Sequence, residues 1–253
     1  MQHFPLSRTR FGTEILAEFV QPEDSSNKVM IFSAGCPGYP LGKEELMHKF
    51  ANLGYWTISY AYRGTWESGG TFLEHPPSDD IITIMDNLEA FEDLWSGTKH
   101  TVRNAEVYLI GGSFGGAATL LASRDPRVKK AISISGVTDW LDQEHTVEPL
   151  DLMSEYLPKA FGMAYRGEQE VYRKLTVGDF YNPTHEKKSF DGSKLLLIHA
   201  KGDRIVHALP AKAFATEVGA QFVILDSDEH MGVGYAKEPR VFKHIEKFLK
   251  GKR

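Results

Sequence analysis

The sequence predicts an α/β fold with a doubly wound, mostly parallel sheet, helices on both faces and a small helical cap inserted before the seventh strand. Two observations indicate this class. First, short apolar runs such as 106–110 and 194–199 alternate with helix-like stretches along the chain. Runs that are apolar throughout are typical of strands buried on both faces, and the intervening helices supply the covering layers. Second, this alternation breaks only once, between Ser135 and Lys194.

The order of the elements follows from these runs and from apolar spacing of three to four residues. A segment at 11–20 alternates more than the others and is expected to form an antiparallel edge. Buried strands are expected at 28–33, 55–60, 106–110, 130–135, 194–199 and 222–225. Helices are expected around Leu46, Phe50 and Leu53, then at 78–95, at 117–123 and at about 239–249.

The break in the alternation predicts the cap. A loop of this length inside a compact domain usually has a function or structure of its own. We therefore expect one domain over residues 1–253, with a helical cap inserted at about 137–190. Peripheral packing that touches no site is the alternative. The aromatic residues of this segment either line a substrate pocket or form ordinary core; they include Tyr156, Phe161, Tyr165 and Tyr172.

Composition excludes several classes of protein. Of the 253 residues, 42% are hydrophobic and 25% are charged, which excludes a disordered chain. A net charge of −5 argues against a nucleic-acid partner. The single cysteine, Cys36, excludes an internal disulfide and a cysteine-based zinc cluster. No other metal motif and no membrane span is present, so we expect a cytoplasmic protein with no metal and no cofactor.

The clearest motif is Gly111-Gly112-Ser113-Phe114-Gly115, which fits G-x-S-x-G directly after one predicted strand and at the start of a helix. This is the context of a nucleophile elbow, in which a sharp turn presents the serine at the carboxyl end of the sheet. A plain tight turn or a phosphate cradle is the alternative. The P-loop and dinucleotide patterns are absent at this position.

A nucleophilic serine needs a base, and the base needs an orienting acid. Chains with this elbow carry the acid and then the base later in the sequence. Asp203 follows the strand that ends at His199, and His230 follows the last strand. Asp139 is the alternative acid, and His199 and His207 are histidines near the acid loop.

An oxyanion hole requires two backbone N–H donors. One is expected from Phe114, the residue after the serine, and the other from Cys36 in the loop after the first buried strand. The alternative for this loop is a plain strand-to-helix turn. The Cys36 thiol itself has no second cysteine and no clear base beside it.

The chain resembles the α/β-hydrolase superfamily over nearly its whole length. More narrowly, it resembles the catalytic domain of the prolyl oligopeptidase type and related bacterial acyl esterases. The stretches that carry the resemblance are YAYRG at 60–64, GGSFGG at 111–116, GVTDW at 136–140 and LLIHAKGD at 196–203 with Val206. The resemblance implies a serine hydrolase in which Ser113 attacks an ester or amide, His230 is the base and Asp203 is the acid.

The chain also departs from this resemblance. Many relatives carry His-Gly before the oxyanion residue, where this chain has Ala34-Gly35. The peptidases carry a propeller domain for which we expect no room here. We therefore expect a carboxylesterase acting on a small-molecule acyl substrate through an acyl-enzyme. A small-peptide serine peptidase and a non-catalytic binding protein on the same fold are the alternatives. The oligomeric state is not predicted by the sequence.

Overall fold

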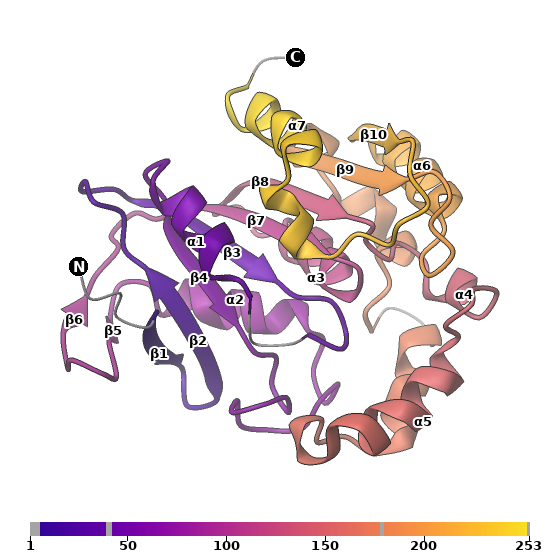
Figure 1. The fold of residues 1–253 in the computed structure, drawn as a ribbon, viewed down its shortest axis with the longest axis horizontal. Coiled ribbons are helices and arrows are strands. Elements are labelled where there is room, and N and C mark those ends of the chain that lie inside the picture. The colour runs from indigo at the N-terminus through magenta and orange to yellow at the C-terminus, as the bar shows by residue number, and fades with distance from the viewer. Residues whose placement is uncertain (1–5, 39–41, 178–179, 252–253) are drawn as a thin grey trace.

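A computed structural model describes residues 6–38, 42–177 and 180–251 of the protein. Its main feature is a twisted eight-stranded sheet in the order β1-β2-β4-β3-β7-β8-β9-β10 (Figure 1). The pairs β1–β2 and β2–β4 are antiparallel, and the remaining pairs are parallel. The strands are β1 (Ser7–Phe11), β2 (Ile15–Val20), β3 (Lys28–Ser33), β4 (Trp56–Tyr60), β7 (Glu106–Gly112), β8 (Val128–Ile134), β9 (Leu195–Ala200) and β10 (Gln221–Leu225).

Helices cover both faces of the sheet. Successive residues of β3 point to opposite sides: Val29 and Ile31 join one buried cluster, whereas Met30 and Phe32 join the other. The first cluster includes apolar residues of α2 (Ser78–Asp86), α3 (Phe114–Ala122) and α6 (Ala208–Val218), and the second includes those of α1 (Glu44–Ala51) and α7 (Pro239–Leu249). This arrangement confirms the predicted α/β class with a mixed, mostly parallel sheet.

The strand predictions are correct to within two residues at each end for the six buried strands. The alternating segment at 11–20 belongs to an antiparallel hairpin, because β1 and β2 pair through the turn between Phe11 and Ile15. Helix α6 was not predicted. It is rich in alanine and ends at Gly219, which has a left-handed φ of 74°, the usual end of a helix.

The prediction of one helix over 78–95 is wrong beyond Asp86. Helix α2 ends there, and Phe91–Glu92 (β5) pairs with Lys99–His100 (β6) in a small antiparallel hairpin. The Phe91 ring packs against those of Phe19 and Trp56, with centroids 5.3 and 5.9 Å away. A continuous helix would have aligned Leu94 with the buried Phe91, but Leu94 is 52% exposed.

Between β8 and β9 the chain forms several helices, of which α4 and α5 lie beyond the carboxyl ends of the central strands (Figure 1). They are α4 (Trp140–Gln143), α5 (Leu150–Phe161) and the 3-10 helices η1 (Gly162–Ala164), η2 (Gln169–Thr176), η3 (Pro183–Ser189) and η4 (Gly192–Lys194). The segment after α5 is bound to the loop after β4: Trp66 N–H donates to Ala164, and Arg166 N–H donates to Gly64. A further 3-10 helix, η5 (Val233–Lys237), precedes α7.

Within residues 6–38, 42–177 and 180–251, no helix has the length and apolar character needed to cross a membrane. Over the same residues, no group of three or more histidine, cysteine, aspartate or glutamate side chains is arranged to hold a metal ion.

Candidate active site

Ser113 lies at the sharp turn between β7 and α3. Its backbone angles, φ 54° and ψ −124°, are outside the regions that non-glycine residues normally adopt. Hydrogen bonds fix this turn: the Ser113 N–H donates to Ile134, and its carbonyl accepts from Gly116 and Val137. The local structure is therefore the strained elbow that the G-x-S-x-G pattern predicts.

Two glycines allow neighbouring loops to approach Ser113. A Cβ atom at Gly35 would lie 3.3 Å from the Ser113 Cβ, so the loop after β3 contacts the serine side chain. A Cβ atom at Gly112 would lie 2.3 Å from the Val233 nitrogen, closer than any real contact allows. The backbone just after His230 therefore packs directly against the elbow.

Asp203 and His230 form a hydrogen-bonded pair. His230 Nδ1 lies 2.9 Å from Asp203 Oδ2. The other carboxylate oxygen, Oδ1, accepts the backbone N–H groups of Ile205 and Val206, each at 3.0 Å. The Asp203 side chain is fully buried, whereas 18% of the His230 side chain is exposed. The arrangement leaves the outer edge of the imidazole open to a reacting group.

The environment of Asp203 keeps it ionised. Burial by itself raises the pKa of this carboxyl group, but hydrogen bonds from His230, Val206 and Ser135 outweigh that effect and lower its pKa below the usual value. The carboxylate is therefore the stable form near neutral pH, as required of a group that orients an imidazole and stabilises its positive charge.

No hydrogen bond joins Ser113 Oγ to His230 within the described chain. The two residues follow β7 and β10, and the contact between Gly112 and Val233 holds their loops together. Hydrogen bonds between nucleophile and base are often long without substrate and shorten in the Michaelis complex.

Two backbone N–H groups beside Ser113 have no acceptor among the described residues. They are those of Cys36, next to Gly35, and of Phe114, the first residue of α3. The N-terminus of a helix carries a partial positive charge, which favours an anion at this position. Both groups have the chemistry of oxyanion donors.

The thiol of Cys36, unlike its backbone N–H group, is not suited to take part in the reaction. Burial raises the pKa of its thiol to about 12, although a hydrogen bond with Tyr165 opposes part of that rise. The reactive form of a cysteine is the thiolate, and it is scarce at neutral pH when the pKa is this high. The main chain of Cys36 therefore matters more for chemistry than its sulfur.

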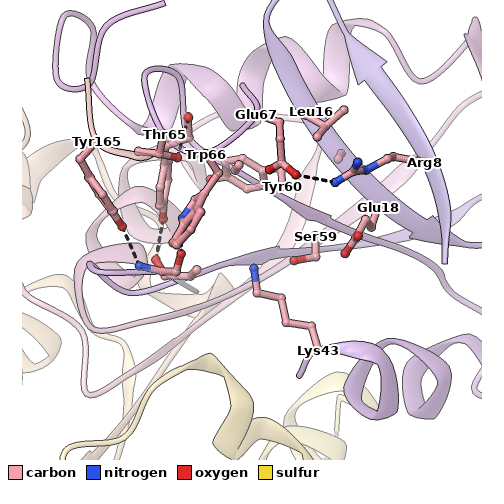
Figure 2. A pocket seen from close by; sticks show the side chains of 15 residues that line it. Arg8, Leu16, Glu18, Lys43, Ser59, Tyr60, Thr65, Trp66, Glu67 and Tyr165 are labelled. Carbon is pink, nitrogen blue, oxygen red and sulfur yellow. Dashed lines mark hydrogen bonds and ion pairs between the residues drawn. The ribbon is translucent and has the colours of Figure 1, made fainter. Parts of the chain in front are cut away.

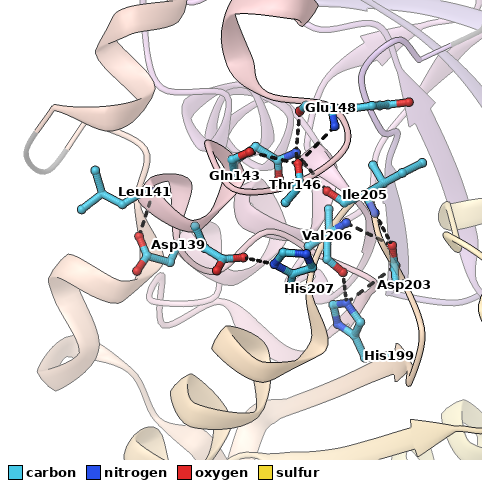
Figure 3. A network of polar contacts seen from close by, with 11 residues as sticks. Asp139, Leu141, Gln143, Thr146, Glu148, His199, Asp203, Ile205, Val206 and His207 are labelled. Carbon is cyan, nitrogen blue, oxygen red and sulfur yellow. Dashed lines mark hydrogen bonds and ion pairs between the residues drawn. The ribbon is translucent and has the colours of Figure 1, made fainter.

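The residues that the sequence offers as an alternative acid or base form contacts elsewhere in the structure. Asp139 caps α4 by accepting the Leu141 N–H at 3.0 Å. His207 pairs with Asp142, with Nδ1 and Oδ2 3.0 Å apart. Buried His199 donates from Nε2 to the Val206 carbonyl at 2.9 Å, behind the Asp203 turn (Figure 3). Burial lowers the pKa of His199, which keeps this imidazole neutral.

The aromatic residues of the segment between β8 and β9 pack in or against one buried cluster. Tyr165 and Tyr172 are only 5% and 2% exposed and pack against Phe72, so they are core residues. Tyr156 and Phe161 are partly buried against the same cluster. Burial raises the pKa of the phenol groups of Tyr156, Tyr165 and Tyr172, with Cys36 close enough to add to the rise.

A small pocket adjoins the loop that follows β3. Figure 2 shows the ammonium group of Lys43 pointing toward Ser59 and Glu18 in this pocket, while Arg8 pairs with Glu67 at its far side. Burial lowers the pKa of Lys43 to about 8, and Glu18 opposes that shift. The pocket is bordered by Ala34 and Gly38 of the same loop that contacts Ser113.

Sequence reasoning missed one residue of this site. Ser135 directly follows β8 with a positive φ of 43°, is fully buried, and accepts the N–H of Met231, the residue after His230, at 3.4 Å. A serine before glycine at a strand end gives no signal of such a role, because the partners are distant in sequence.

The comparisons with known proteins agree with this geometry. The model of the prolyl oligopeptidase family matches residues 44–252. No curated protein matches the chain. Among solved structures, the uncomplexed acylaminoacyl peptidase of Pyrococcus horikoshii is 21% identical with a TM-score of 0.66; the match covers 98% of this chain and 41% of that one. The chain thus spans less than half the length of that peptidase.

Two further structures are similar over most of both chains. Est1E of Butyrivibrio proteoclasticus, solved with ferulic acid bound, is 18% identical with a TM-score of 0.66, covering 94% of this chain and 95% of that chain. The α/β hydrolase GrgF of Penicillium sp. sh18 is 16% identical with a TM-score of 0.72, covering 98% and 99%.

The sheet order, the elbow and these likenesses define an α/β-hydrolase fold. Because the family model matches most of the chain, the protein belongs to the prolyl oligopeptidase family.

Proposed function

We propose that the protein is a carboxylesterase-like enzyme that cleaves a small acyl ester through a covalent acyl-enzyme. The observation that carries this proposal is the Asp203–His230 hydrogen bond beside a strained Ser113. A positioned acid, base and nucleophile of these types is the arrangement used for acyl transfer.

In the proposed mechanism Ser113 Oγ attacks the ester carbonyl carbon while His230 Nε2 accepts the serine proton. Asp203 holds Nδ1–H and stabilises the imidazolium that forms. The N–H groups of Cys36 and Phe114 bind the negative oxygen of the tetrahedral intermediate. The imidazolium then protonates the departing alcohol, and a water molecule activated by His230 releases the acid in the same way.

A small-peptide peptidase is the second candidate, because the family and the structure from Pyrococcus horikoshii both point to peptide chemistry. A peptidase that binds a substrate amino terminus needs a free acidic group near the site. Asp142 is engaged with His207, and Glu144 and Glu148 are exposed. The engagement of Asp142 favours the ester interpretation, whereas Glu144 and Glu148 stay available to a substrate amino terminus. A binding protein without activity would have no use for the Asp203–His230 pair.

The test is hydrolysis of p-nitrophenyl esters from acetate to dodecanoate beside a panel of aminoacyl anilides, with wild type and Ser113→Ala assayed together. We expect ester turnover that falls by at least about 10³-fold in Ser113→Ala, because the nucleophile is removed. Turnover of anilides alone would move the function to a peptidase. Equal activity in the variant would reject Ser113 as the nucleophile.

A further inference from the structure

The loop that follows β3, residues 34–38, carries the proposed oxyanion donor of Cys36 but lacks side chains that could fix its own conformation. Its alanine, two glycines and proline have no polar side-chain group, and a thiol is a weak hydrogen-bonding group. A backbone N–H stabilises an oxyanion effectively only if it is held in place before the reaction. Groups outside the loop are therefore needed to hold it.

Two side chains hold the end of this loop at Gly38. The Gly38 N–H donates to the phenol oxygen of Tyr165 at 2.8 Å, and the Gly38 carbonyl accepts the indole N–H of Trp66 at 2.5 Å. Figure 2 shows both side chains directed at the loop. The donor and the acceptor of the Gly38 backbone are thus both used, which fixes the orientation of this residue.

The start of the loop is held in the same way. The carbonyl of Ala34 accepts the phenol O–H of Tyr62, a buried residue, at 2.8 Å. Between its two ends the loop is closely folded. A Cβ atom at Gly38 would lie 2.8 Å from the Gly35 carbonyl oxygen, and one at Gly35 would lie 3.3 Å from the Ser113 Cβ. A displacement of Gly38 is therefore expected to move the part of the loop that contacts the nucleophile.

Trp66 and Tyr165 are also joined to each other. Trp66 lies in the loop after β4, and Tyr165 directly follows η1 in the segment between β8 and β9. Thr65 and Tyr165 form an antiparallel bridge, and the Trp66 N–H donates to the Ala164 carbonyl at 2.9 Å. Trp66 has a left-handed φ of 46°, which a residue with a Cβ atom keeps only where its surroundings enforce it. The two residues therefore form one joint support for the loop.

We propose that Tyr165 and Trp66 are positioning residues of the active site, whose hydrogen bonds to Gly38 hold the backbone N–H of Cys36 in place to bind the oxyanion; this rests on the proposed function. Their effect belongs to the transition state, because the substrate oxygen becomes negative only as the tetrahedral intermediate forms. Through Tyr165, the segment between β8 and β9 acts on the reaction without having to touch the substrate.

Conservative substitutions remove these hydrogen bonds and keep an aromatic ring. Tyr165→Phe removes the oxygen that accepts the Gly38 N–H, and Trp66→Phe removes the indole donor. Tyr172→Phe is the matched control. Tyr172 lies in the same segment and packs against Phe72 as Tyr165 does, with ring centroids 6.1 Å apart, but its hydroxyl forms no hydrogen bond with the residues that the structure describes. This control is expected to keep wild-type activity.

We expect kcat for ester hydrolysis to fall roughly tenfold in Tyr165→Phe and in Trp66→Phe, a smaller loss than the about 10²–10³-fold caused by removing an oxyanion donor outright. KM should stay within about twofold, because ground-state contacts are unchanged. The affinity for a trifluoromethyl ketone, whose adduct with Ser113 carries an oxyanion, should fall by the same factor as kcat. A wild-type kcat in Tyr165→Phe, a loss confined to KM, or an equal loss in Tyr172→Phe would overturn the proposal.

Hydrogen exchange of the Gly38 amide, followed by NMR, tests the proposal apart from turnover. Because Tyr165 accepts this N–H, exchange should be at least about tenfold faster in Tyr165→Phe than in wild type and unchanged in Tyr172→Phe. Unchanged exchange in Tyr165→Phe would contradict the proposal. If wild type cleaved neither substrate panel, the proposed function would fail, and the exchange rate would still decide whether Tyr165 holds the loop.

Discussion

Ser113 and Ser135 both have positive φ angles at the carboxyl ends of neighbouring strands. Strain of this kind costs about 1–3 kcal/mol at each position and tends to gather where function needs a fixed side-chain direction. At Ser113 the strain belongs to the sharp turn between β7 and α3. At Ser135 it lies directly after β8, where the hydroxyl accepts the N–H of Met231.

The thiol and the backbone N–H group of Cys36 differ in their chemical properties. Its raised thiol pKa disfavours the thiolate, while its backbone N–H has no acceptor among the described residues and belongs to the loop that contacts Ser113. In the proposed mechanism the residue contributes through a group that every amino acid other than proline possesses. The replacement of His-Gly by Ala34-Gly35 leaves that donor in place.

The lowered pKa of Lys43 predicts an effect on the stability of the fold. Its pKa in the folded chain is lowered to about 8 by burial, below the usual value of about 10.4. The buried ammonium therefore destabilises the fold at neutral pH, and this penalty declines as the pH rises from 8 toward 10. Lys43→Met should raise the free energy of unfolding at pH 7 by roughly 1 kcal/mol, because partial exposure leaves some hydration.

Urea unfolding between pH 6 and 10 measures this effect. The variant should lack the gain in stability that wild type shows above pH 8. Lys129→Met, at an exposed position of β8, is the matched control and should reproduce the wild-type dependence. A Lys43→Met variant less stable than wild type at pH 7 would contradict the account.

At the scale of elements, the end of α2 is set by aromatic packing. Phe91 contacts Phe11, Phe19 and Trp56 within one buried cluster. Phe91→Ala should lower the free energy of unfolding by about 3–4 kcal/mol through loss of burial and creation of a cavity. Chemical denaturation measures this change.

Leu94→Ala is its control, because Leu94 is half exposed after the turn and should change stability by less than about 0.5 kcal/mol. In a continuous helix over 78–95 the two side chains would share a buried face. Similar losses in the two variants would therefore contradict the hairpin.

The elements that the sequence predicts well are those with a strong local pattern. Buried strands such as β3 and β9 are apolar throughout, and α7 combines a proline start with regular apolar spacing. The end of α2 was missed because Leu94 and Trp95 extend the helical pattern by chance. Only the tertiary contacts of Phe91 decide against it.

The same distinction applies to the candidate site. The elbow is a local motif, and the order of strand ends leads to Asp203 and His230, which the structure brings into contact. Ser135 has no local motif, because its hydroxyl contacts Met231, which lies 96 positions later in the chain. Such contacts exist only after β8, β9 and β10 have paired.

At the scale of the whole molecule, the parallel order of β3, β7, β8, β9 and β10 brings five strand ends to one edge of the sheet. The loop after β3 carries Cys36, and β7 leads into Ser113. The ends of β8, β9 and β10 lead to Ser135, Asp203 and His230. A crevice at the carboxyl ends of the strands is where open α/β sheets bind their ligands.

The most direct measurement is mass spectrometry of the protein after reaction with an alkyl fluorophosphonate, a probe that phosphonylates activated serines. We expect a single adduct on the peptide containing Ser113, no adduct in Ser113→Ala, and much slower labelling of His230→Ala because the base is lost. An adduct on Cys36, an adduct retained in Ser113→Ala, or wild type left unlabelled would contradict the assignment of Ser113 as the nucleophile.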